Sequence, residues 1–130
     1  MAKKRILLID DEPDLLATTK FLLENEGYKV YTAGSGAEGI KKFEEISPDL
    51  ILLDIVMPGM DGFETLHQLR NVYPDSEHIP IIMLTVRTEV ESTFQAKGFG
   101  ATDYITKSEK SDLLLAKIKK IFSQSNSIDE

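Results

Sequence analysis

The sequence contains no cysteine and no apolar run long enough to cross a membrane. Without cysteine the chain forms neither a disulfide nor a thiolate metal site, and a cytoplasmic location is allowed. Near the start, the apolar run Ile6–Ile9 is too short for a signal peptide and ends at two aspartates. We therefore expect a soluble, cytoplasmic protein with no membrane partner.

Basic residues are also scarce, because 15 Lys and Arg stand against 22 Asp and Glu and leave a net charge of −7. A domain this acidic is a poor candidate for binding phosphate backbones, so we expect no direct contact with nucleic acid. The 130 residues, 42% of them hydrophobic, fit a single domain with its own core.

Five short segments have the pattern of β-strands: "RILLID" (5–10), "YKVYTA" (28–33), "DLILLD" (49–54), "IPIIMLT" (79–85) and "TDYIT" (102–106). The first, third and fourth are almost continuously apolar, which is typical of strands covered on both faces. Amphipathic segments between the strands predict helices. Their apolar stripes are Leu15, Leu16, Leu22 and Leu23; Ala37, Ile40 and Phe43; Phe63, Leu66, Leu69 and Tyr73; and Leu114, Ile118 and Ile121.

This alternation predicts an α/β fold with a doubly wound parallel sheet and helices on both faces. Right-handed crossovers favour the strand order 2-1-3-4-5, which reverses between the first and third strands and predicts a ligand site at their carboxyl ends. Residues 87–97 form the weakest of the predicted helices. We expect the domain to occupy residues 1–123, with 124–130 as a polar tail or the start of a linker.

Three acids, Asp10, Asp11 and Asp54, stand at the carboxyl ends of the first and third predicted strands. Such carboxylates repel each other unless a cation lies between them, and an all-oxygen set favours Mg²⁺, or Mn²⁺, over zinc. Thr85 ends the fourth strand and Lys107 follows the fifth. This set suits phosphoryl transfer, in which Asp54 attacks phosphorus while the metal, Thr85 and Lys107 stabilise the phosphoryl oxygens.

Plainer interpretations exist for each of these residues. Asp10 and Asp11 could cap the helix that begins near Pro13, which is worth roughly 0.3–1 kcal/mol. Taken alone, Thr85 would be an ordinary strand residue and Lys107 a solvated charge. The combination favours the phosphoryl site. The last helix carries three lysines that form either a solvated face or part of a partner surface: Lys117, Lys119 and Lys120.

The motifs "LLIDDEPD", "LILLDIVMPGMDG", "IIMLT" and "GATDYITK" resemble those of the receiver domain of two-component response regulators, chemotaxis regulators among them. The resemblance covers residues 3–122 and implies the flavodoxin-like fold, with the same strand order. It also implies that Asp11, Asp54 and the backbone carbonyl of Val56 ligate Mg²⁺ directly, whereas Asp10 acts mainly through water.

The resemblance further implies a signalling switch in a phosphorelay, not an enzyme in the usual sense. Asp54 would accept phosphate from a sensor histidine kinase or a phosphotransfer protein, and Thr85 and Lys107 would bind the phosphoryl group. Tyr104 matches the family's switch aromatic. The remodelled surface would comprise residues 87–97, the fifth strand and the last helix, where an output domain, an effector or a second copy binds.

Several positions depart from the family's pattern. Ser108 follows Lys107 where proline is usual, so we expect a trans bond and a reshaped loop. Val86 is larger than the usual residue and would narrow access to the acceptor. Val56 cannot orient a hydrolytic water and Arg87 could shield a phosphoryl group, which together predict slow self-dephosphorylation.

Three other functions compete with the switch. A receiver-like interaction module that works without phosphorylation is the main alternative, since Ser108 and Val86 are unusual. A metal-dependent phosphohydrolase with an aspartyl nucleophile needs a second acid two residues after that nucleophile, and Val56 stands there. Flavin binding has only the fold in its favour.

Overall fold

The structure is a computed structural model that describes residues 3–54, 62–72, 78–85, 102–106 and 111–129. Along the chain the elements are β1 (Arg5–Ile9), α1 (Pro13–Asn25), β2 (Lys29–Ala33), α2 (Gly36–Ile46), β3 (Leu50–Asp54), α3 (Gly62–Val72), β4 (Ile81–Thr85), β5 (Asp103–Thr106) and α5 (Ser111–Asp129). All five predicted strands are confirmed, with ends that differ by one or two residues. The predicted helix at 87–97 lies outside the described residues.

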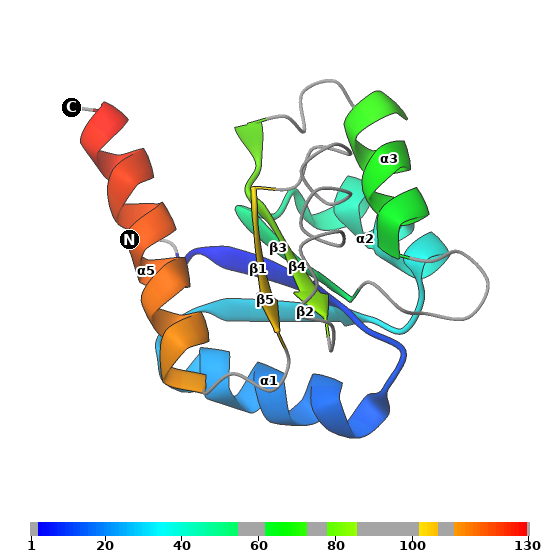
Figure 1. Ribbon diagram of the computed structural model, residues 1–130, viewed down its shortest axis with the longest axis horizontal. Coiled ribbons are helices and arrows are strands. Elements are labelled where there is room, and N and C mark those ends of the chain that lie inside the picture. The colour runs from blue at the N-terminus through cyan, green and yellow to red at the C-terminus, as the bar shows by residue number, and fades with distance from the viewer. Residues whose placement is uncertain (1–2, 55–61, 73–77, 86–101, 107–110, 130) are drawn as a thin grey trace.

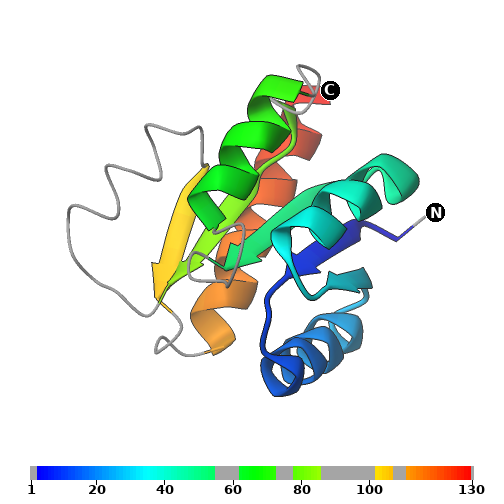
Figure 2. The same cartoon turned by 90° about the vertical axis from the view of Figure 1, so that its right-hand side faces the viewer.

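The strands form one parallel sheet in the predicted order β2-β1-β3-β4-β5. Helices α1 and α5 cover one face and α2 and α3 cover the other (Figure 1). Because the strands are parallel, their arrowheads gather at one end of the sheet (Figure 2). The doubly wound α/β fold is therefore confirmed, and the reversal between β1 and β3 brings their carboxyl ends together.

The central strands are buried on both faces, which explains their continuous apolar sequences. Leu7, Ile9, Ile51 and Leu53 pack toward α2 and α3. The intervening residues pack toward α1 and α5, where Leu23 and Ile118 are also fully buried: Ile6, Leu8, Leu50 and Leu52. Successive side chains of a strand point to opposite faces, so each strand contributes to two separate hydrophobic clusters.

Local sequence signals set the ends of the first two helices. Pro13 occupies the first turn of α1, and Gly27 follows the helix with a φ of +96°, a conformation that suits glycine. At the start of α2 the Ser35 hydroxyl accepts a hydrogen bond from the Glu38 N–H at 3.2 Å. The Glu38 carboxylate in turn accepts from the Gly34 N–H at 3.0 Å. This is a capping box, a helix start visible in the sequence as Ser-x-x-Glu.

Helix α5 continues to Asp129, past residue 123 where we expected the folded domain to end. After Ser111 the segment contains no glycine or proline, so its backbone can remain helical although its last residues are polar. The domain boundary itself stays a prediction. Among the described residues, none of the helices is long and apolar enough to span a bilayer.

Gly39 lets α2 approach β1 closely. A methyl group at this position would collide with the Cδ1 atom of Ile9 and would lie 2.8 Å from its Cγ1 atom. We expect Gly39→Ala to lower the free energy of unfolding, because overpacking costs about 1–3 kcal/mol and exceeds the gain of up to about 1 kcal/mol in helix propensity. Urea denaturation measures the change.

The matched control is Gly34→Ala, where the added methyl meets only the Glu38 carboxylate at 3.6 Å. The free energy of unfolding of that variant should stay close to that of wild type. Adding Ile9→Val, which removes the colliding Cδ1 atom, should return part of the stability that Gly39→Ala loses. A Gly39→Ala protein at least as stable as wild type would show that Ile9 moves aside without cost.

Candidate metal site at the carboxyl ends of β1 and β3

Three carboxylates meet where β1 and β3 end side by side. Ile9 at the end of β1 lies in register with Leu53, so the residues that follow, Asp10 and Asp54, are neighbours. Asp10 is 1% exposed and Asp54 3% exposed, whereas Asp11 is exposed to solvent. The structure therefore brings together the three acids that the sequence analysis placed at the ends of two separate strands.

The three side chains are close enough to share one cation. Each offers a carboxylate oxygen, and these atoms lie within 4.8 Å of one another. Hard oxygen donors, two of them buried, are the ligands that Mg²⁺ prefers, and Mn²⁺ accepts the same set. The residues present therefore fit the divalent cation that the sequence predicted.

Asp10 also shapes the turn that presents Asp11. Its backbone N–H donates to the Ala33 carbonyl at 3.0 Å, which continues the pairing with β2. Its carboxylate accepts a hydrogen bond from the Glu12 N–H at 3.1 Å, while Glu12, the N-cap residue of α1, makes no side-chain cap. Asp10 thus supports the helix start, as its plainer interpretation held, and still contributes a carboxylate to the cluster.

The other predicted site residues are placed only in part. Thr85 ends β4, one residue after the position paired with Asp54, and it lies in register with Thr106 of β5. Tyr104 lies in β5 opposite Met83. The remaining predicted positions lie outside the described residues, and their roles stay predictions: Val56, Val86, Arg87, Lys107 and Ser108.

The family assignment follows from comparison with known proteins. The family sequence model of the response regulator receiver domain matches residues 6–119 of this chain. This chain belongs to that family. The receiver domain is 38% identical over 122 residues to the alkaline phosphatase synthesis transcriptional regulatory protein PhoP of Bacillus subtilis, covering 94% of this chain and 50% of that protein. It spans about half the length of the curated relatives it matches.

Solved receiver domains superpose along almost the whole chain. A CheY-like response regulator receiver domain protein from Methanospirillum hungatei has a TM-score of 0.87 and 35% identity, covering 97% of this chain and 98% of that one. The Vibrio cholerae chemotaxis protein CheY4 also has a TM-score of 0.87, at 31% identity, with 92% and 98% covered. The fold expected from the resemblance is thus confirmed by structure as well as by sequence.

Binding of a divalent cation to this receiver domain should raise its thermal stability. A ligand that binds only the folded state stabilises it by about 2.7 kcal/mol at 100 times its dissociation constant. We expect Mg²⁺ to raise the melting temperature and Asp11→Asn to remove most of that rise. Asp14→Asn, which neutralises an exposed acid in the first turn of α1, should keep it. An equal rise in NaCl of matched ionic strength would argue against a specific site.

Proposed function

We propose that this receiver domain accepts a phosphoryl group on Asp54 from the phosphohistidine of a sensor histidine kinase or a phosphotransfer protein. The cluster of Asp10, Asp11 and Asp54 carries this proposal. A carboxylate oxygen of Asp54 attacks phosphorus and forms an O–P bond. The N–P bond of the donor breaks, and its electron pair stays on the imidazole nitrogen, which takes up a proton from solvent.

The protein's part in this step is to hold the attacking carboxylate still. Asp54 ends a fully buried strand whose register is set on both sides, by β1 and by β4. A Mg²⁺ ion held by Asp11, Asp54 and the Val56 carbonyl, with Asp10 acting through water, would offset the negative charge of the reacting groups. Thr85 and Lys107 would bind the phosphoryl oxygens, as the family resemblance implies.

Phosphorylation would then change the surface to which partner proteins bind. Thr85 and Thr106 are in register, so a displacement at the end of β4 acts directly on β5, which also carries Tyr104. The surface affected comprises residues 87–97, β5 and α5. Shifting a conformational equilibrium from about 1:99 to 99:1 requires about 5.5 kcal/mol of preference for the active state. The domain thereby acts as a cytoplasmic switch that also promotes its own slow dephosphorylation.

The relatives indicate which kind of partner binds this surface. PhoP of Bacillus subtilis is a transcriptional regulatory protein about twice as long as the match with this chain. We infer that this domain acts on an output domain or a separate effector, with a homodimer as another possible assembly. With a net charge of −7, the domain itself would leave any contact with DNA to that partner.

The experiment that tests this function is intact-mass spectrometry after incubation with acetyl phosphate, with and without Mg²⁺. We expect one phosphoryl adduct that forms only when the metal is present. Absence of an adduct in a folded protein that also fails to bind Mg²⁺ would favour the interaction module that works without phosphorylation.

A further inference from the structure

A pocket of about 520 Å³ lies at the amino ends of β1 and β2, opposite the end of the sheet that carries the acidic cluster. Figure 1 shows these two strands beginning near the end of α1. The volume falls within the range of about 300–1,000 Å³ that is usual for small-molecule sites. The pocket is lined by Lys3, Glu24, Tyr28 and Lys29. Charged side chains dominate this lining, so the pocket suits a polar ligand.

Both ammonium groups of the pocket are available to a ligand. Lys3 and Lys29 form no ion pair with any carboxylate in the part of the chain that the structure describes. The Lys29 ammonium lies 5.8 Å from the centroid of the Tyr31 ring, a contact that leaves its charge uncompensated. Lys29 is paired across the strands with Arg5, two residues after Lys3. The two lysines therefore lie on adjacent chains, where their long side chains can reach one anion.

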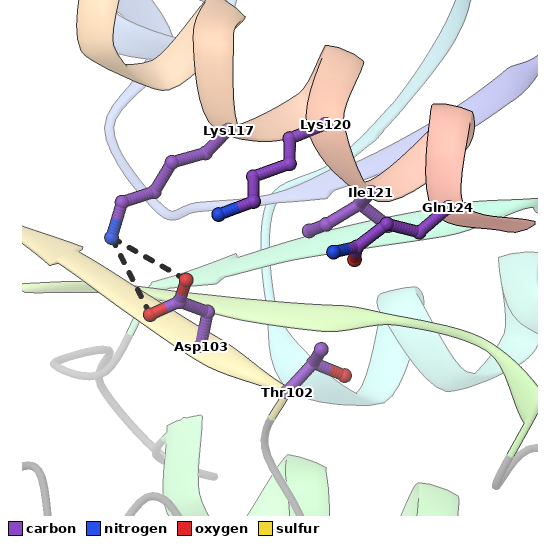
Figure 3. A pocket seen from close by; sticks show the side chains of 6 residues that line it. All are labelled: Thr102, Asp103, Lys117, Lys120, Ile121 and Gln124. Atoms are coloured by element: carbon purple, nitrogen blue, oxygen red, sulfur yellow. Dashed lines mark hydrogen bonds and ion pairs between the residues drawn. The ribbon is translucent and has the colours of Figure 1, made fainter.

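Elsewhere in this region the charges are already paired. In the pocket between β5 and α5, Figure 3 shows Lys117 facing Asp103, and its ammonium lies 3.4 Å from both carboxylate oxygens. Glu26, which follows α1, lies 3.5 Å from Lys119. Of the groups that line the pocket at β1 and β2, only the Glu24 carboxylate opposes the two ammonium groups. This pocket therefore carries a net positive charge in a chain whose net charge is −7.

The end of α1 does not compete for these ammonium groups. A helix C-terminus attracts cations because its last carbonyls are unpaired. Here the Leu23 carbonyl accepts from the N–H groups of Glu26 and Tyr28, at 3.1 and 3.3 Å. The Glu24 carbonyl accepts from the Gly27 N–H at 3.0 Å. Because these carbonyls are satisfied within the chain, the lysines remain free to bind an external anion.

Tyr28 adds a neutral hydrogen-bond donor on a supported ring. Its ring centroid lies 5.6 Å from that of Phe122, with the two planes inclined by 48°. Burial and, second to it, the charge of Glu26 raise the pKa of Tyr28 above its usual value. The hydroxyl therefore stays protonated at neutral pH and can donate to an anion.

We propose that this pocket binds a small phosphate monoester that also carries hydroxyl groups, as a sugar phosphate or a nucleotide does. Lys3 and Lys29 bind the phosphate through charge-assisted hydrogen bonds, and Tyr28 donates to one of its oxygens. Glu24 repels the phosphate but accepts hydrogen bonds from the hydroxyl groups at the other end of the ligand. This division of roles favours a hydroxyl-bearing ester over inorganic phosphate.

The test is a ¹⁵N NMR titration of the unphosphorylated protein with ribose 5-phosphate, AMP and inorganic phosphate, in EDTA. Without a metal ion the acidic cluster repels all three probes, so binding there does not interfere. We expect ribose 5-phosphate to shift the amide signals of Tyr28 and Lys29 and to bind more tightly than inorganic phosphate. Tighter binding of AMP would identify a nucleotide as the ligand, and equal affinities of the two esters would identify a sugar phosphate.

Two variants examine the roles of the charges. Lys29→Gln should weaken the binding of ribose 5-phosphate by about two- to fivefold, as for a single exposed ion pair. Lys41→Gln, which changes an exposed lysine of α2 outside the pocket, is the matched control and should leave the affinity unchanged. Glu24→Ala should strengthen the binding of inorganic phosphate and remove the preference for ribose 5-phosphate.

Each contrary result overturns a definite part of the proposal. Equal binding of ribose 5-phosphate and inorganic phosphate to wild type, or equal losses in Lys29→Gln and Lys41→Gln, would overturn the site. A preference that persists in Glu24→Ala would overturn the role of Glu24. Since the titration uses neither Mg²⁺ nor a phosphoryl donor, its outcome is independent of whether Asp54 accepts phosphate.

Discussion

Asp54→Asn is expected to take up no phosphoryl group from acetyl phosphate under conditions in which wild type is labelled. The amide that replaces the carboxylate is a far weaker nucleophile and carries no charge to bind a cation. Asparagine has nearly the same shape, and it removes one of three mutually repelling charges, so the variant should fold. Intact-mass spectrometry of both proteins, each with Mg²⁺, makes the comparison.

The control for this loss is Asp49→Asn, which changes the acid that precedes β3. Asp49 lies at the opposite end of the sheet, where its carboxylate accepts a hydrogen bond from the Arg5 N–H at 2.8 Å. An asparagine oxygen can accept the same bond, so Asp49→Asn should be labelled like wild type. An adduct that persists in Asp54→Asn would place the acceptor on another acid and would refute the proposed role of Asp54.

The largest loss of stability is expected from Leu52→Ala in β3. Leu52 is fully buried in the strand between β1 and β4, within the cluster that faces α1 and α5. Truncating such a leucine to alanine costs about 2–5 kcal/mol, because transfer free energy is lost and a cavity remains. Against a total stability of about 5–15 kcal/mol for a domain, this is a large fraction. Urea denaturation with an unchanged m-value measures it.

Phe21→Ala is the matched control, since it removes a larger apolar side chain from the surface. Phe21 lies on α1 and is 68% exposed. Its truncation should change the free energy of unfolding by no more than about 0.5 kcal/mol. A loss below about 1 kcal/mol in Leu52→Ala would mean that the α5 side of the core repacks around the missing atoms, contrary to a close-packed interior.

These two predictions test different properties of one strand. Leu50–Leu53 are buried and hold β3 between its neighbours, whereas Asp54 at its end is the proposed phosphate acceptor. We expect Asp54→Asn to lose phosphorylation but keep its stability. We expect Leu52→Ala to lose stability but keep the phosphate acceptor. Together these results would separate the chemistry of the strand from its part in folding. The strand serves as a rigid support for a carboxylate at its carboxyl end.

Strands and their order were predictable because they depend on a pattern that repeats along the chain. The run from Leu50 to Leu53 marks a strand covered on both faces, and alternation with helical stripes leaves few topologies. The predicted ends of the strands were less exact. The fourth strand begins at Ile81 and not at Ile79, because Pro80 lacks the N–H that a strand in the sheet's interior must donate. Its carbonyl does accept from the Ile51 N–H.

By itself, the sequence determined the fold class, the family and the identity of the acids at the strand ends, because periodicity and motif spacing are properties of neighbouring residues. Tertiary structure alone decided the contacts between elements. It brings the oxygens of Asp10, Asp11 and Asp54 within 4.8 Å and pairs Lys117 with Asp103. The three lysines of α5 look alike in the sequence. Their different surroundings arise from how the helix packs across β5 and beside α1, which no local pattern encodes.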